Sequence, residues 1–336
     1  MKGEFLLNIK DLSVSFFIPA GEVKAVDKLS LDLKHGEVLG IVGESGSGKS
    51  VSAYSIMGLL SDPGKIVGGS IEFNDRHLEN LDEKSYRKIR GNEIGIIFQD
   101  PMTSLNPVFT IGNQIMEALL LHKKMTKQEA REKAADLLRL VGVNEPEKRL
   151  KQYPHEFSGG MRQRVMIAMS LACEPKLLIA DEPTTALDVT IQAQILDLIK
   201  ELKNKINMSI IMITHDLGVV SDICDRIIVM YAGQIVESGR IDDIFYDPQH
   251  PYTIGLLNSM PKLYSETHEK LIPIEGTPVD LLNPPPGCPF APRCKKCMKI
   301  CLAEKPSYRE HAEGHLSACW LFEKGEFDKG GANENE

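Results

Sequence analysis

Gly43-Glu-Ser-Gly-Ser-Gly-Lys-Ser50 decides the fold of this chain, because it is a complete G-x-x-x-x-G-K-[ST] phosphate-binding loop. The apolar run 38–42 before it is typical of a buried strand, and residues 51–57 after it are compatible with a helix. Backbone N–H groups and a helix N-terminus can surround phosphates only in that context. A glycine-rich turn without a ligand is the alternative, but the complete pattern predicts a nucleoside triphosphate site.

The residues of this loop have separate expected roles. Glycines let the main chain approach the phosphates closely, Lys49 can reach the β- and γ-phosphates, and the Ser50 hydroxyl can bind Mg²⁺. The residues expected to contact the nucleotide are Gly43, Ser45, Gly46, Ser47, Gly48, Lys49, Ser50 and Val51. A triphosphate and a magnesium ion are therefore expected together at this loop.

The 336 residues are enough for about two domains, and their composition is ordinary for a globular protein, with 42% hydrophobic and 26% charged residues. A net charge of −8 argues mildly against binding nucleic acid through overall charge. We expect no signal peptide, and no window reaches the roughly 18–20 apolar residues that cross a bilayer. Any membrane role is therefore expected to be peripheral.

Alternating apolar and polar residues over 5–40 predict an antiparallel layer of strands that leads into the nucleotide-binding strand. In this layer Phe16 or Phe17 could stack on a purine base, although the pattern alone favours packing in the core. The next expected elements are a strand over 71–73, a helix over 82–90, a strand over 94–98 and a loop over 100–107. Gln99 stands where the second of these strands enters the loop.

Between residues 111 and about 140 the apolar residues recur at helical spacing, which predicts a helical lobe over about 100–165. At the end of this lobe Ser158 is a suitable N-cap, and Gly159 and Gly160 would expose their backbone N–H groups at the start of a helix. The chain therefore offers a second helix N-terminus that can bind an anion.

Two further buried strands are expected to end in polar side chains. The run 177–180 is followed by Asp181 and Glu182, which beside a phosphate loop can hold Mg²⁺ and orient a water molecule, although two adjacent acids could also form a solvated turn. The run 211–214 ends at His215, a candidate contact to the γ-phosphate, although a lone histidine at a strand end is usually structural. Alternating strands and helices predict a mostly parallel α/β core.

Together these motifs resemble the nucleotide-binding domain of ABC ATPases. The matching stretches are the phosphate loop 43–50, the glutamine loop at Gln99, the signature 158–163, the Walker B strand 177–182, the D-loop 185–188 and the switch histidine His215. The resemblance implies a P-loop NTPase with an antiparallel β subdomain, a mostly parallel α/β core, a helical lobe and a small cysteine-rich C-terminal extension. It assigns 1–250 to the nucleotide-binding domain and 251–330 to the extension.

The resemblance also implies roles for the polar residues at the strand ends. Glu182 would be the general base or the residue that positions the attacking water, with His215 and Gln99 as the other catalytic residues. Asp181, together with Ser50 and Gln99, would complete the Mg²⁺ shell. The implied reaction is hydrolysis of ATP.

The same resemblance implies a head-to-tail pair of such domains, with ATP between the phosphate loop of one and Ser158, Gly159 and Gly160 of the other. Phe16 would be the aromatic residue that stacks on adenine. Met161 stands where most members of the family carry Gln, and methionine cannot donate a strong hydrogen bond. The chain departs from the family pattern at that position.

Residues 98–107, the methionine-bearing signature and residues 250–257 resemble the ATP-binding subunits of dipeptide and oligopeptide importers. This resemblance implies an ATPase that is peripheral on the cytoplasmic face of the membrane. Its implied partners are a second ATPase subunit, expected to form a heterodimer with it, two transmembrane permease subunits and, indirectly, an extracytoplasmic peptide-binding protein, with no nucleic acid. The alternatives are a related importer of nickel, glutathione or another solute, and a soluble ABC ATPase outside transport.

The stretch after residue 248 is rich in cysteine. Five of the seven cysteines are Cys288, Cys294, Cys297, Cys301 and Cys319. With His311 and His315 nearby, they predict a soft-metal site, and zinc held by four cysteines or by three cysteines and a histidine fits that prediction. Disulfides are the less favoured alternative. Cys173 and Cys224 lie in apolar stretches and are expected to be buried in the core.

The peptide-importer branch often carries four cysteines in this order and binds a [4Fe–4S] cluster through them. The ligands that the resemblance implies are Cys288, Cys294, Cys301 and Cys319. Cys297 is an additional candidate, because Cys294-x₂-Cys297-x₃-Cys301 is itself similar to a ferredoxin spacing. Arg293 and Lys295 could offset the charge of the thiolates, although a run of charges on the surface is the simpler interpretation.

Overall fold

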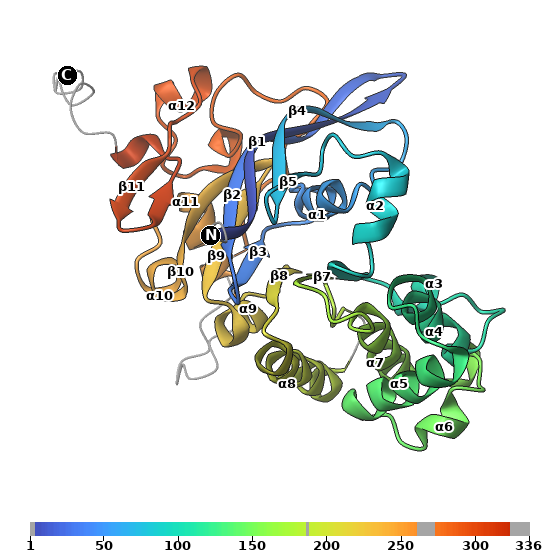
Figure 1. The fold of residues 1–336 in the computed structure, drawn as a ribbon. Helices are drawn as coiled ribbons and strands as arrows, with labels where there is room; N and C mark the ends of the chain where they lie inside the picture. Colours follow the sequence, from blue (N-terminus) through green and yellow to red (C-terminus); the bar gives the residue numbers. More distant parts are fainter. Residues whose placement is uncertain (1–3, 186–187, 261–272, 323–336) are drawn as a thin grey trace, which may run out of the picture.

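The computed structural model describes residues 4–185, 188–260 and 273–322, which fold around two sheets (Figure 1). The smaller sheet is antiparallel and has the strand order β2-β1-β4-β5. Its strands are β1 (Phe5–Ile18), β2 (Gly21–Lys34), β4 (Gly64–Phe73) and β5 (Arg76–His77). Leu29, Leu31 and Leu33 of β2 are buried while the residues between them are not, as a period of two requires. The predicted antiparallel layer is confirmed.

The larger sheet has the strand order β11-β12-β10-β9-β3-β8-β7-β6. Its parallel strands are β3 (Val38–Val42), β6 (Ile94–Ile97), β7 (Leu177–Asp181), β8 (Ser209–Thr214) and β9 (Arg226–Tyr231). They are almost continuously buried, because other layers cover both faces of this part of the sheet. The carboxyl ends of β3, β6, β7 and β8 lie at one edge of the sheet, which places the phosphate loop beside the predicted acids.

Antiparallel strands continue this sheet beyond β9. They are β10 (Gln234–Arg240), β11 (Arg309–Ala312) and β12 (His315–Ser317). Glu237 of β10 lies opposite Ser317 of β12 in the pairing. The hairpin β11–β12 comes from the cysteine-rich stretch, so the part of the chain that was expected to be a small extension is joined to the central sheet.

The helices between β6 and β7 gather at the lower right of Figure 1, where the helical lobe was expected. They are α3 (Pro101–Ser104), α4 (Ile111–His122), α5 (Lys127–Leu140), α6 (Pro146–Arg149) and α7 (Gly159–Ser170). The helical stretch predicted between 111 and 140 is divided into α4 and α5. Thr126 starts α5 in a capping box, in which its hydroxyl accepts from the Glu129 N–H and its own N–H donates to the Glu129 carboxylate.

The other helices lie around the two sheets. They are α1 (Lys49–Met57), α2 (Glu83–Ile89), α8 (Val189–Ile206), α9 (Leu217–Ile223), α10 (Ile241–Tyr246), α11 (Pro251–Asn258) and α12 (Lys299–Ala303). Within the described ranges, every helix is too short or too polar to serve as a membrane span.

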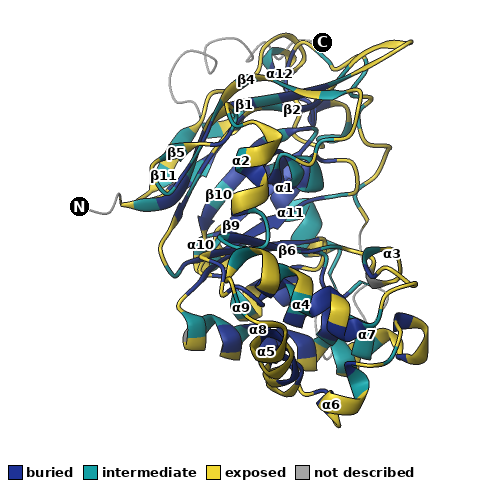
Figure 2. Cartoon of the chain, turned by 45° about the vertical axis from the view of Figure 1, so that its right-hand side comes forward, coloured by how far each residue is buried: buried dark blue, intermediate teal, exposed yellow. Residues whose placement is uncertain are grey.

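The central sheet separates two hydrophobic cores. Val38 and Val42 of β3 pack in the core on the helical side, whereas Leu39 and Ile41 pack in the core shared with the antiparallel sheet. This alternation follows from the period of two along a strand. Figure 2 shows the result as buried strands in the middle of the molecule with partly exposed helices on the outside. The loop after β3 is therefore anchored by a strand that is fixed on both faces.

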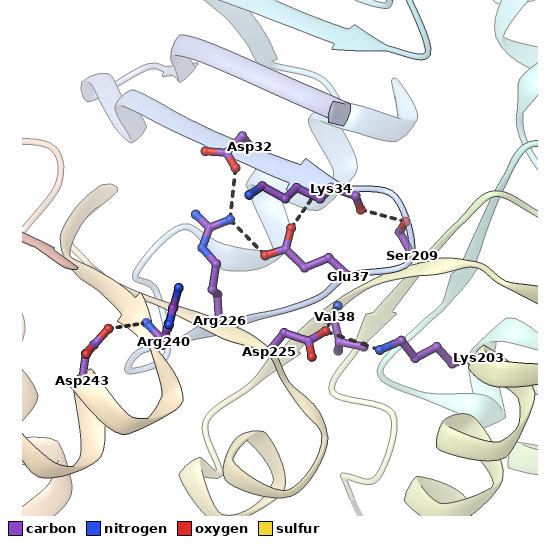
Figure 3. Close-up of polar contacts among 10 residues, drawn as sticks. All are labelled: Asp32, Lys34, Glu37, Val38, Lys203, Ser209, Asp225, Arg226, Arg240 and Asp243. Carbon is purple, nitrogen blue, oxygen red and sulfur yellow. Dashed lines mark hydrogen bonds and ion pairs between the residues drawn. The ribbon is translucent and has the colours of Figure 1, made fainter. Parts of the chain in front are cut away.

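Polar contacts fix the opposite end of β3 (Figure 3). Arg226 Nη1 of β9 lies 3.0 Å from Asp32 Oδ2 of β2 and 2.9 Å from Glu37 Oε1, so it joins the antiparallel layer to the central sheet. The Val38 N–H donates to Asp225 Oδ2 over 2.7 Å. The strand that carries the phosphate loop is thus held at its start by ion pairs and hydrogen bonds, and at its faces by apolar packing.

Candidate functional site

The phosphate loop joins β3 to α1, as predicted, and two of its glycines are required by geometry. A Cβ atom on Gly43, whose φ is +153°, would lie 2.2 Å from the Met230 carbonyl oxygen. A Cβ atom on Gly48, whose φ is +98°, would lie 2.5 Å from the Ala25 carbonyl oxygen. Only glycine can bring the loop this close to β9 and β2. Because Gly48 has no side chain to cap α1, the first N–H groups of that helix are available to an anion.

Lys49 lies inside this loop. Its Nζ donates to the Gly43 carbonyl over 2.7 Å and to the Glu44 carbonyl over 2.8 Å. Burial lowers the pKa of Lys49, and the nearby Glu182 and Asp181 carboxylates act in the opposite direction. The amine is therefore held over the loop, where phosphate oxygens can replace the two carbonyl groups as its partners.

Ser50 and Asp181 form a site that fits a magnesium ion. Ser50 Oγ donates to Asp181 Oδ1 over 3.0 Å, which brings together the start of α1 and the end of β7. The other oxygen, Asp181 Oδ2, is buried and accepts no hydrogen bond from any described residue. Burial raises the pKa of the Asp181 carboxyl. A buried carboxylate oxygen without a partner, beside a hydroxyl group, suits an oxygen-binding cation.

Glu182 is the centre of the remaining polar contacts. Its Oε2 accepts from Gln99 Nε2 and from Thr185 Oγ1, both over 2.9 Å, and its Oε1 lies 3.3 Å from His215 Nδ1. The backbone of Glu182 has a φ of +48°, which is uncommon for a residue other than glycine. Its N–H donates to the Ile213 carbonyl of β8 over 2.8 Å. The residues predicted after β6, β7 and β8 therefore meet at one carboxylate.

The signature segment lies elsewhere in the chain. Ser158 caps α7 by accepting from the Met161 N–H, as predicted. A Cβ atom on Gly159 would meet nothing within 4 Å, so this end of the helix is open. Figures 1 and 2 both show α7 in the helical lobe, apart from α1. The two helix termini that were expected to bind anions do not form a single site within one chain. Ala186 and Leu187 of the expected D-loop lie outside the described residues.

Phe16 is half-buried on β1, and its ring packs against Gly64 of β4. In the pairing with β2, Phe16 lies opposite Val23, two residues from the Ala25 carbonyl that contacts the loop at Gly48. Phe17 is 48% exposed. Of the two aromatic residues, Phe16 is therefore the one whose ring is packed in place near the phosphate loop.

The C-terminal cysteines form a second candidate site. One small pocket is lined by Cys288, Cys294, Cys301 and Cys319. The Cys301 sulfur atom accepts a hydrogen bond from the Met298 N–H over 3.4 Å. Burial raises the pKa of Cys288 to about 12 and that of Cys319 to about 11, with the neighbouring cysteines adding to the effect. These thiols stay protonated at neutral pH unless a cation replaces their protons.

Other predicted ligands lie outside this pocket. Cys297 is exposed, and its thiol donates to the Met298 carbonyl. His315 is buried and lies 2.9 Å from Glu237 Oε1, and His311 contacts the Ser317 hydroxyl over 2.7 Å. All seven cysteines are free thiols. Within the described residues, no three or more His, Cys, Asp or Glu side chains are close enough to hold a single metal ion.

Comparison with known proteins identifies the family. The model of the family described as "ABC transporter" matches residues 26–185, and that of the "Oligopeptide/dipeptide transporter, C-terminal region" matches 236–301. The oligopeptide transport ATP-binding protein OppD of Escherichia coli (strain K12) is 56% identical, with 95% of this chain and 94% of that protein covered. The dipeptide transport ATP-binding protein DppD of Bacillus subtilis (strain 168) is 56% identical, with 95% of each covered. This chain is an ABC transporter ATP-binding protein.

A solved structure supports the fold of this ABC protein. The ATP-binding cassette MJ0796, in a dimeric post-hydrolysis state bound to ADP and Pi, superimposes with a TM-score of 0.64 at 29% identity. The match covers 70% of this chain and 98% of that structure. The ABC-type arrangement predicted from the sequence, with an antiparallel β layer beside a mostly parallel core, is confirmed.

The ABC motifs were found from sequence, but several contacts around them were not. Arg293 was interpreted as a charge that could offset the thiolates or, more simply, as a surface charge, yet its side chain is only 4% exposed and binds the Glu44 carboxylate of the phosphate loop. The interpretation as a surface charge was wrong. Lys295 is exposed and pairs with Glu275, as a surface charge would. The acidic residue inside the phosphate-loop motif was the only signal that a basic partner was needed. Cys173 and Cys224 are buried, as predicted.

Proposed function

We propose that this protein is the ATP-hydrolysing subunit of an ABC transporter that imports oligopeptides or dipeptides. The convergence of Gln99, Thr185 and His215 on Glu182, beside a phosphate loop and an orphaned Asp181 oxygen, supports ATP hydrolysis. The relatives named as oligopeptide and dipeptide transport proteins cover almost the entire chain and support the peptide cargo.

The proposed roles of the residues follow from their positions. The loop from Gly43 to Val51 and the start of α1 would hold the phosphates, with Phe16 stacked on the adenine. Ser50, Asp181 and Gln99 would hold Mg²⁺, which neutralises charge on the phosphates when bound. Glu182 would take the proton of the attacking water, with His215 beside it. Gln99 donates to Glu182 through its amide nitrogen, which leaves its amide oxygen to bind the metal.

A second ATPase subunit would complete the nucleotide site. Ser158, Gly159 and Gly160 stand at the N-terminal end of α7 in the lobe, away from the phosphate loop of the same chain, and the space beside Gly159 is open. They are therefore suited to close over ATP bound by a partner, which would be a sister subunit in a heterodimer. In this proposal residues 1–250 bind nucleotide and 251–330 form the extension. The pair sits on the cytoplasmic face of the membrane against two permease subunits, which receive peptide from an extracytoplasmic binding protein.

The cysteine pocket would hold a [4Fe–4S] cluster. Four thiols line one pocket, and the Met298 N–H donates to the Cys301 sulfur atom. N–H groups that point at sulfur stabilise thiolates and the charge of a cluster. The thiolates of a cluster bind separate iron atoms and stand farther apart than four ligands of one zinc ion, whose Zn–S distance is about 2.3 Å. Zinc bound by the same thiols is the alternative.

Reconstitution tests the proposed cargo. The protein, its sister ATPase and the two permease subunits that are encoded with it would be assembled in lipid vesicles, and ATP hydrolysis would be measured with candidate solutes. We expect di- and oligopeptides, delivered by the binding protein, to stimulate hydrolysis and to accumulate inside. Stimulation by nickel or glutathione alone would contradict the peptide assignment, and hydrolysis that is indifferent to permeases and solutes would contradict a role in transport.

A further inference from the structure

The second residue of the phosphate loop carries a charge opposite in sign to what its ligand needs. Glu44 places a carboxylate beside a loop whose expected ligand is a polyanion. In the structure this carboxylate is paired with Arg293. Arg293 Nη1 lies 2.6 Å from Glu44 Oε2, and Arg293 Nη2 lies 3.0 Å from Glu44 Oε1. The two parallel contacts form a bidentate fork between residues that are 249 positions apart in the sequence.

Arg293 is itself held in place by its surroundings. Its Nε donates to the Glu275 carbonyl over 3.0 Å, and its Nη2 also donates to the Ile274 carbonyl over 3.2 Å. The guanidinium lies over the Tyr231 ring, 5.8 Å from the centroid. With the side chain 4% exposed and its donors directed at fixed acceptors, Arg293 is a preorganised partner for Glu44 rather than a mobile surface charge.

The main chain of Glu44 is fixed as well. Its N–H donates over 2.9 Å to the hydroxyl of Tyr252, which is fully buried in α11 with its ring centroid 4.7 Å from that of Tyr231. Its carbonyl accepts from Lys49 Nζ. The conformation of Glu44 therefore helps to decide where the Lys49 amine lies, and residues outside the loop set that conformation.

The charge of the phosphate loop and the position of the Lys49 amine both depend on the ion pair between Glu44 and Arg293. Without Arg293, the Glu44 carboxylate would repel the phosphates across a partly buried site, where charges are weakly screened. It would also be free to attract the Lys49 amine away from its place over the loop. With Arg293 present, the loop offers a neutral ion pair on one side and a cation on the other.

We propose that Arg293 is a positioning residue for nucleotide binding. By holding Glu44 in the bidentate ion pair, it allows the phosphate loop to accept a triphosphate. ATP affinity therefore depends on the cysteine-bearing segment 273–322. This proposal rests on the proposed function in so far as ATP must bind at the loop. Arg293 ends a short 3₁₀ helix, Ala291–Arg293, between Cys288 and Cys294, so the same turn serves both the cysteine pocket and the loop.

Equilibrium titration with ATP tests the proposal on the full-length protein. We expect Arg293→Ala to weaken ATP binding about tenfold, because the Glu44 carboxylate is left unpaired. Arg293→Lys should recover part of the affinity, because an ammonium group supplies the charge without the fork. The double variant Glu44→Gln/Arg293→Ala should bind ATP within about threefold of the wild type, because the repelling charge is gone.

Lys295→Ala is the matched control, since Lys295 lies two residues from Arg293 and forms an exposed ion pair with Glu275 at 3.1 Å. It should leave ATP affinity unchanged. Unchanged affinity in Arg293→Ala, or a double variant as weak as that single variant, would overturn the proposal. The outcome that the wild type itself does not bind ATP is different, because it would contradict the proposed function. Thermal unfolding without nucleotide shows whether a variant is folded. If Arg293→Ala is not folded, the ATP affinity of the double variant is compared with that of the wild type instead.

Discussion

Glu182 is the residue on which the polar contacts of the site converge. Replacing Glu182 with Gln keeps the size of the side chain and its contacts to neighbours, but removes its ability to accept a proton. We expect this variant to bind ATP normally and to hydrolyse it at least about a hundredfold more slowly. Equilibrium nucleotide binding and phosphate release would be measured on the same preparation.

Thr185→Val provides the control for that change. Thr185 Oγ1 donates one hydrogen bond to Glu182 and has no proton-accepting role. Its loss should slow hydrolysis by less than about tenfold, the effect of one hydrogen bond. Hydrolysis by Glu182→Gln at the wild-type rate would contradict the role of Glu182 as the proton acceptor.

Single residues differ in how far the sequence predicts them. Lys49, Ser50 and Asp181 were predicted because short motifs with fixed spacing place them at the start of a helix and at the end of a strand. The partner of Glu44 was not predicted, because Arg293 reaches the phosphate loop only through the folding of the whole chain. Nothing in the spacing around Arg293 distinguishes it from the exposed Lys295.

At the scale of an element, the cysteine-bearing turns between residues 288 and 319 carry the second site. We expect protein purified without oxygen to be brown, with about four irons and acid-labile sulfide in each chain. Serine in place of any one of Cys288, Cys294, Cys301 or Cys319 should lower the iron content sharply, because each thiol lines the pocket.

Cys297→Ser is the matched control within that element, because Cys297 is exposed and lies outside the pocket. Its iron content should equal that of the wild type. Stoichiometric zinc without sulfide would contradict the cluster, and loss of iron in Cys297→Ser would contradict the choice of ligands.

Elements with strong local signals were the ones predicted correctly. The buried strands and the cap at Ser158 follow from short patterns of apolar residues and from capping chemistry. The hairpin β11–β12 has no such signal, because its strands, REHA and HLS, are short and mostly polar. They become strands by pairing with β10, which is a tertiary contact that local sequence does not encode.

At the scale of the whole molecule, the C-terminal segment packs against the part of the chain that carries the phosphate loop. A chain that ends at residue 282 would leave β10 without its partner β12 and Tyr231 and Tyr252 without the Phe290 ring that packs on both. We expect it to unfold about 5 °C or more below the full-length protein and to bind ATP more weakly. Thermal unfolding and ATP titration would measure both effects.

Full-length Arg293→Ala separates the two effects, because it keeps the hairpin and loses only the contacts of one side chain, the fork among them. Its unfolding temperature should lie closer to that of the wild type than the temperature of the shortened chain does. A shortened chain with wild-type stability and wild-type ATP affinity would show that the segment is independent of the site.

The fork between Glu44 and Arg293 also limits how such proteins can be recombined. A chimera that joins residues 1–260 of this protein to the C-terminal segment of another ABC protein keeps Glu44 paired only if the graft brings an arginine to the same turn. Conversely, a graft that carries the arginine onto a loop without an acid at position 44 buries an unpaired cation. We therefore expect an acid at position 44 and an arginine at position 293 to occur together in related proteins, although the two positions lie near opposite ends of the chain.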